Sequence, residues 1–256
     1  MSIGSPVVTP LSRDRDKGKV RLPGKAASDR GDRFFYGGMT FVIAAVILAG
    51  FSPSFFMRPL FTRPPLIPLA IVHGIVMSTW LLILITQTAL ISADNARLHR
   101  KLGLAAFVMI PLMLGLAWAM TIVNTNHLPK TFNPLPFMVI PMGDIGLFAI
   151  LAGTAMYYRR DPEMHKRLMI LACVNLVPPA IFRLGNPHVP GFGMFSFWAW
   201  MDILVLAGPI YDMARGRKLH KAWVYGGLLI VAAQPFRVWL MHTALWDSIA
   251  RAITSR

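Results

Sequence analysis

The sequence predicts an all-α membrane protein, a seven-helix transmembrane bundle built as one helix followed by three helical hairpins. Two observations lead to this fold class. First, 55% of the 256 residues are hydrophobic and only 14% are charged, which gives more apolar surface than a soluble domain of this size can bury. Second, the apolar residues form successive runs of roughly 20 residues, each long enough to cross a hydrocarbon core of about 30 Å.

The runs divide the chain into a transmembrane domain at 34–247, a basic tail at 1–33 and a short outer tail at 248–256. The basic tail lacks apolar periodicity, so we expect it to be disordered and cytoplasmic. Its cations favour contact with anionic lipid headgroups, although a solvated tail that only sets the topology is the alternative. The seven runs are approximately Phe35–Phe56, Leu66–Ile91, Gly103–Val123, Phe137–Tyr157, Leu168–Arg183, Phe195–Tyr211 and Ala222–Leu245.

The distribution of Lys and Arg predicts the orientation of the bundle. When the segments between runs are assigned to alternate sides, 19 of the 26 cations fall on the side of the N-terminus. Cytoplasmic segments of membrane proteins are enriched in cations, so the N-terminus is predicted in the cytoplasm and the C-terminus in the periplasm. We therefore expect a protein of the bacterial inner membrane. The net charge of +15 would suggest nucleic acid in a soluble protein, but its placement between apolar runs argues against that partner.

A short motif recurs at the three inner turns. In each, a histidine (His99, His165 or His220) is followed by a cation and opens an apolar run. This recurrence predicts internal symmetry of three hairpins, although inner loops that each need cations would also produce it. Three converging imidazoles would suit zinc or copper, but the adjacent cations oppose a bound dication, so no metal site is predicted.

Ionisable residues within the apolar runs are the first functional candidates, because an unpaired charge there costs several kcal/mol. Five of them share one predicted depth in the outer half of the bundle: His73, Asp144, Arg183, Asp202 and Arg237. They are predicted to line an outward-opening site that binds or moves a small polar or anionic ligand. The arginines would anchor an anion, and the acids and the histidine would handle protons or orient the ligand. The alternative is a set of salt bridges that lock the bundle.

His73 also raises haem ligation as an alternative, because it is the histidine placed clearly within an apolar run. A haem held by two imidazoles needs a second histidine at a similar depth. His242 lies about 10 Å closer to the outer surface, and His188 would have to fold back from an outer loop. A hydrogen-bonded core histidine is the competing interpretation. Gly74 and Ser78 beside it form a small-residue face that lets another helix approach closely.

The segment His165-Lys166-Arg167-Leu168-Met169, followed by an apolar helix, resembles the His-Lys-x-x-Met helix start of a group of uncharacterised bacterial multi-pass membrane proteins. Some members look linked to cytochrome oxidase assembly, so the resemblance implies haem or copper chemistry. It covers about one hairpin. The chain differs from the group in having one clear membrane histidine where such proteins carry several.

Several common enzyme motifs are absent from the sequence. It contains no glycine-rich phosphate loop, GxSxG elbow, HExxH motif or paired CxxC, which argues against nucleotide hydrolysis and metalloprotease chemistry. Three hypotheses remain: a binding or transport protein, a haem-linked redox or cytochrome oxidase assembly protein, and a lipid-modifying enzyme with Asp144 or Asp202 as base.

Overall fold

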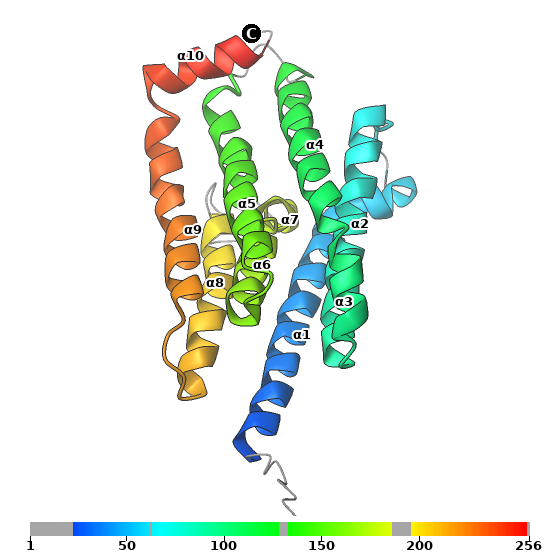
Figure 1. Cartoon of the computed structure of the whole chain (residues 1–256). Coiled ribbons are helices and arrows are strands. Elements are labelled where there is room, and N and C mark those ends of the chain that lie inside the picture. The colour runs from blue at the N-terminus through cyan, green and yellow to red at the C-terminus, as the bar shows by residue number, and fades with distance from the viewer. Residues whose placement is uncertain (1–22, 62, 128–132, 186–195, 255–256) are drawn as a thin grey trace, which may run out of the picture.

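The chain folds into helices joined by turns, as Figure 1 shows for the computed structural model. Residues 23–61, 63–127, 133–185 and 196–254 are described, and no strand occurs in these ranges. The predicted all-α class is therefore confirmed. The helices are α1 (Pro23–Phe51), α2 (Pro68–Ser92), α3 (Ala96–Gly103), α4 (Ala106–His127), α5 (Val139–Tyr157), α6 (Pro162–Val174), α7 (Pro178–Leu184), α8 (Ser196–Ala214), α9 (Lys221–Leu240) and α10 (Ala244–Ile253), with short helical turns η1 (Ser52–Phe56), η2 (Arg58–Leu60) and η3 (Pro136–Met138).

Several of these helices suit a multi-pass membrane protein. Segments long and apolar enough to cross a bilayer are Arg30–Phe56, Pro68–Ser92, Ala106–His127, Pro136–Tyr157 and Pro162–Leu184, and the bent pair α9–α10 adds a sixth if it counts as one span. The seven predicted crossings therefore also require α8, which falls outside this set. Asp202, Asp212 and Pro209 lower the hydropathy of α8.

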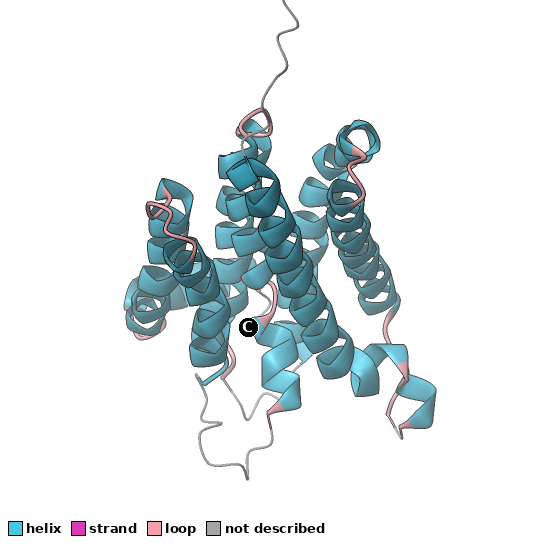
Figure 2. Cartoon of the chain, turned by 90° about the horizontal axis from the view of Figure 1, so that it is seen from below, coloured by secondary structure: helices cyan, strands magenta, loops and turns pink. Residues whose placement is uncertain are grey.

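Two groups of helices make up the bundle. Helices α5, α6, α8 and α9 pack together, while α1, α2 and α4 form the other group, and α7 and α4 join the two (Figures 1 and 2). Fully buried side chains such as Ile43, Leu171, Met201 and Ile230 fill the core. Many apolar side chains of α2 and α4 stay exposed, as expected where a helix faces lipid instead of protein.

The fifth predicted run is interrupted in the structure. Pro178 and Pro179 lack the N–H groups that would bond to the carbonyls of Val174 and Asn175, so α6 ends at Val174 and α7 begins at Pro178. We call the end of the bundle at which α1 and α6 begin the inner end, and the end crossed by α10 the outer end. The inner end of α6 extends beyond the apolar run because Asp161 caps it. The Asp161 carboxylate accepts hydrogen bonds from the backbone N–H groups of the second and third helical residues, at 3.1 and 3.2 Å.

The two ends of the chain are more helical than the apolar runs suggested. Helix α1 begins at Pro23, inside the segment predicted to be disordered, while residues 1–22 lie outside the described part of the chain. At the other end α9 stops at Leu240, and α10 turns by 90° across the outer end of the bundle (Figure 1). The predicted boundary at 247 therefore lies inside α10. Trp246 anchors this helix by donating its indole N–H to the carbonyl of Leu135, at 2.7 Å.

Helix α7 packs directly on the backbone of α1 at Gly50. A Cβ atom at this position would lie 2.4 Å from the carbonyl oxygen of Ala180. A backbone neighbour cannot move aside like a flexible side chain, so the close contact between α1 and α7 depends on glycine.

We expect Gly50→Ala to lower the free energy of unfolding by about 1–3 kcal/mol, because the two helices must separate to admit the methyl group. Gly38→Ala is the matched control in the same helix, since a Cβ at Gly38 meets nothing within 4 Å. Thermal unfolding of both variants in detergent micelles measures the difference. Equal midpoints for Gly50→Ala and the wild type would contradict the close packing.

Candidate functional site

An ion pair joins α5 and α9 near their outer ends. The Nη1 atom of Arg237 donates to Oδ1 of Asp144 at 2.5 Å and to the carbonyl oxygen of Ile140 at 3.2 Å. The Nε atom of Arg237 donates to the carbonyl oxygen of Ala233 at 3.0 Å. Both charged residues are buried, with 8% exposure for Asp144 and 2% for Arg237. The predicted pairing of an outer acid with an outer arginine is found here.

Neighbouring residues fix the position of the Arg237 side chain. Gly143 makes room for it, because a Cβ atom there would lie 2.3 Å from Cδ of Arg237. The guanidinium carbon lies 4.9 Å from the ring centroid of Trp198, the distance of a cation–π contact. The arginine is thus packed between the backbone of α5 and an aromatic ring of α8.

Asn175 completes the group at the break between α6 and α7. Its Nδ2 atom donates to the backbone carbonyl of Asp144 at 2.8 Å, and the residue is fully buried. Two atoms of this group, Oδ1 of Asn175 and Nη2 of Arg237, are buried without a hydrogen-bond partner among the described residues. The two side chains that hydrogen-bond to Asp144 therefore each keep one orphaned atom, an acceptor on Asn175 and a donor on Arg237. Unsatisfied groups of this kind are rare in folded proteins and call for a physical reason. We call Asp144, Asn175, Trp198 and Arg237 the outer cluster.

The other predicted site residues have partners of their own. Asp202 accepts a hydrogen bond from Nε2 of Gln234 at 2.7 Å, and no described arginine forms an ion pair with it. The predicted second acid–arginine pair is thus replaced by an acid–amide pair. Gln234 lies on α9 one turn before Arg237, so Asp202 is in the same layer as the outer cluster.

Arg183 and His73 lie toward α1 instead. The guanidinium of Arg183 stacks over the ring of Phe51, at 4.4 Å from its centroid, and donates to the carbonyl of Pro179 at 2.8 Å. His73 is close enough to Arg183 for an electrostatic interaction, and its Nδ1 atom is buried without a partner in the described structure. Beside it, a Cβ on Gly74 would lie 2.2 Å from the ring of Phe55. The small-residue face of α2 thus receives a phenyl ring.

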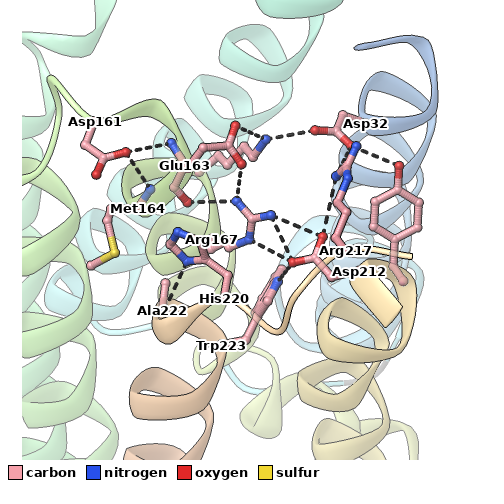
Figure 3. A network of polar contacts seen from close by, with 12 residues as sticks. Asp32, Asp161, Glu163, Met164, Arg167, Asp212, Arg217, His220, Ala222 and Trp223 are labelled. Carbon is pink, nitrogen blue, oxygen red and sulfur yellow. Dashed lines mark hydrogen bonds and ion pairs between the residues drawn. The ribbon is translucent and has the colours of Figure 1, made fainter. Parts of the chain in front are cut away.

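A second polar group, which the sequence analysis missed, lies at the inner ends of α1, α6, α8 and α9 (Figure 3). At its centre Nε and Nη2 of Arg167 donate to the carboxylate of Asp212, with a shortest distance of 2.9 Å. The side chains of this pair are 3% and 1% exposed. The indole N–H of Trp223 also donates to Asp212, at 2.9 Å, and Gly208 leaves space for the ring, since a Cβ there would approach it to 2.4 Å.

Asp32 connects α1 to this group. Its carboxylate accepts hydrogen bonds from Nζ of Lys166 at 2.8 Å, from Nη1 of Arg217 at 2.7 Å and from the hydroxyl of Tyr211 at 2.9 Å. Glu163 in turn accepts from Lys166 and Arg167. We call these residues the inner network: Asp32, Glu163, Lys166, Arg167, Tyr211, Asp212, Arg217 and Trp223.

The inner network is balanced and saturated. Its three carboxylates face three cations, and Nε, Nη1 and Nη2 of Arg167 all donate hydrogen bonds. This arrangement leaves little for a ligand to satisfy, so it acts as a lock between four helices. One sequence signal was available, because Glu163 and Arg167 have the i, i+4 spacing of a helical ion pair. Asp32 was hidden in the segment assigned to the tail.

The three turn histidines do not converge. The rings of His99 and His165 lie 6.3 Å apart, and Nδ1 of His165 is 2.8 Å from the carbonyl oxygen of Ala155. His220 instead caps α9, where its Nδ1 atom accepts from the N–H of Ala222. Partial burial and then the charge of Arg167 lower the pKa of His220, which favours the neutral ring that this cap requires. Among the described residues, no cluster of three or more His, Cys, Asp or Glu side chains is arranged to hold a metal ion.

Comparison with known proteins adds no family assignment. No protein-family model matches the chain, and neither the curated proteins nor the solved structures contain a significant match. The interpretation therefore depends on the geometry of the outer cluster and the inner network.

We expect Asp212→Ala to destabilise the protein by about 3–5 kcal/mol, because it leaves the guanidinium of Arg167 buried without its main partner. The exposed Asp247–Arg251 pair of α10 provides the control, and Asp247→Ala should barely change the unfolding midpoint. Chemical unfolding in detergent compares the two variants. An equally small effect of both substitutions would show that the inner network does not lock the bundle.

Proposed function

We propose that this chain is a multi-pass inner-membrane protein with seven crossings, and that its outer cluster binds a small polar or anionic ligand from the periplasmic side. The observation that carries the proposal is the pair of orphaned atoms beside Asp144. Arg237 offers an N–H donor, Asn175 offers an oxygen acceptor, and both are buried. A bound ligand with complementary groups would satisfy both atoms.

The helix break beside the cluster supports a binding site. Asn175 stands where α6 stops and α7 begins, and interrupted helices near the middle of a membrane bundle commonly form ligand or ion sites. An arginine is suited to this task, since its planar guanidinium holds an anion through parallel hydrogen bonds. The ring of Trp198 contacts the guanidinium, whose Nη2 atom has no described partner.

The inner network supports access from the outer side. It ties α1, α6, α8 and α9 together at the ends where the cations of the inner segments gather (Figure 3). The excess of Lys and Arg on this side supports its placement in the cytoplasm. With the cytoplasmic end locked, a ligand reaches the outer cluster from the periplasm.

We expect purified wild-type protein to bind a small anion, and Arg237→Gln to weaken that binding at least tenfold because the cationic donor is lost. Acetate, chloride and inorganic phosphate are suitable probes in isothermal titration calorimetry. Arg251→Gln is the control, since this exposed arginine of α10 pairs only with its own helix neighbour Asp247 among the described contacts. If the wild type binds none of the probes, or Arg237→Gln binds them equally well, the outer cluster is not an anion site.

A second candidate function, haem-linked redox or cytochrome oxidase assembly, depends on His73. Its Nδ1 atom is buried and without a described partner, so the imidazole has a nitrogen to offer. Neutral imidazole is a common axial ligand of haem iron.

If this second function holds, the protein purified from haem-supplied cells shows a Soret absorbance band, and His73→Ala removes it because the axial ligand is gone. His220→Ala serves as the comparison, since His220 is not a proposed haem ligand and its Nδ1 atom caps α9. A purified wild type without a Soret band excludes haem binding.

A further inference from the structure

The two orphaned atoms of the outer cluster belong to Arg237 and Asn175, the two side chains that hydrogen-bond to Asp144, and this arrangement has a specific chemical consequence. We propose that an anion binds at Arg237 together with one proton, which Asp144 takes up. This inference rests on the proposed function of the outer cluster and deepens it, because it names the ligand class, a small monovalent anion, and the ion that accompanies it.

The first step is charge balance. Asp144 and Arg237 together carry no net charge, and both are buried. A bound monoanion would leave one uncompensated negative charge in an apolar bundle, which is strongly unfavourable. Protonation of Asp144 restores neutrality, because the anion then takes over the role of counter-charge to Arg237.

Asp144 is the acid that pairs directly with Arg237. Of the elements packed against α5, helix α9 contributes Arg237, the charged group that acts on Asp144. The charged residues of α6 are at its inner end, in the inner network. Helix α4 contributes His127, which is exposed at its outer end. On α8, Asp202 is hydrogen-bonded to Gln234.

The second step concerns the hydrogen bonds. Arg237 now gives Nη1 to the Asp144 carboxylate and leaves Nη2 without a partner. An anion that accepts from both nitrogens displaces the carboxylate from Nη1. The released carboxyl group, once protonated, has an O–H donor that needs an acceptor.

Asn175 provides that acceptor. Its amide is held beside Asp144 by the bond from Nδ2 to the Asp144 carbonyl at 2.8 Å, and its Oδ1 atom is unpartnered. In the proposed state the protonated carboxyl group of Asp144 donates its O–H to this oxygen. The empty donor and the empty acceptor thus both find partners in one state, in which anion and proton are bound together. The proton and the anion both come from the periplasmic solution, and no covalent bond other than the O–H bond forms or breaks.

The test is calorimetric titration of the wild type with acetate and with chloride at several pH values between 5 and 8, in two buffers with different ionisation enthalpies. Over the range in which free Asp144 is ionised, the Kd should rise tenfold for each unit of pH, and the buffer dependence of the heat should report one proton taken up per anion. Wild-type protein alone gives this count, so the result does not depend on how a variant folds.

Asp144→Asn identifies the proton acceptor, because the amide imitates the protonated acid. This variant should bind the anions with a Kd that no longer changes with pH and with no proton uptake. Asp247→Asn, on the exposed face of α10, should keep the wild-type slope. If Asp202→Asn abolishes the pH dependence of the Kd while Asp144→Asn retains it, the proton acceptor is Asp202, and the inference is overturned.

The failures of the two proposals are distinguishable. Anion binding with an affinity independent of pH and no proton uptake would refute the coupling, while the binding function would stand. A wild type that binds neither anion at any pH would refute the binding function itself. A folded Asp144→Asn variant that binds no anion would also refute the coupling, because the carboxylate would then be needed in its charged form.

Discussion

The buried ion pair between Arg167 and Asp212 is the interaction on which the arrangement of the bundle depends. It joins α6 to α8, and its neighbours bring in α9 through Trp223 and α1 through Asp32. Charges removed from water are tolerated only when their hydrogen-bonding groups are satisfied. In this network the carboxylates and cations are matched and their donors are used. The inner ends of four helices, two of them far apart in the sequence, are therefore held in one register.

The outer cluster, in contrast to the inner network, keeps buried hydrogen-bonding atoms without described partners. It contains one buried ion pair, but a donor of Arg237 and an acceptor of Asn175 remain without described partners. The cost of leaving both atoms unsatisfied is roughly 1–3 kcal/mol for each, whereas the inner network pairs its carboxylates with its cations. Proteins concentrate such exceptions at functional sites. The contrast between the two ends, more than the presence of charge, separates the candidate site from the structural lock.

The sequence predicted the all-α class and most helix positions because long apolar runs and the charges between them are local signals. It indicated ion pairs among two acids and two arginines at one depth, because charges in an apolar bundle have few other partners, and Asp144 and Arg237 form one such pair. The break at Pro178 was visible as two prolines, but its neighbour Asn175 gains meaning only from contact with α5.

Other features depend on contacts that no local pattern reveals. Asp202 has a glutamine as its partner, and pairing acids with arginines by charge overlooks a neutral amide at the same depth. Asp32 belongs to a helix whose start is polar, so the apolar run begins only after it. The turn of α10 requires Trp246 to reach the carbonyl of Leu135, which lies more than a hundred residues earlier.

The inner network bears on whether a ligand at the outer cluster is only bound or is also transported. Passage of a ligand into the cytoplasm would require the inner ends of α1, α6, α8 and α9 to separate. This separation would break the ion pair between Arg167 and Asp212 and leave both charges unpaired in an apolar environment. Water that enters with the ligand would have to solvate those charges at the same moment. Binding from the periplasmic side, as proposed, would leave the inner network closed. The proposed activity is therefore reversible binding at the outer cluster, and any transport would require the inner network to open.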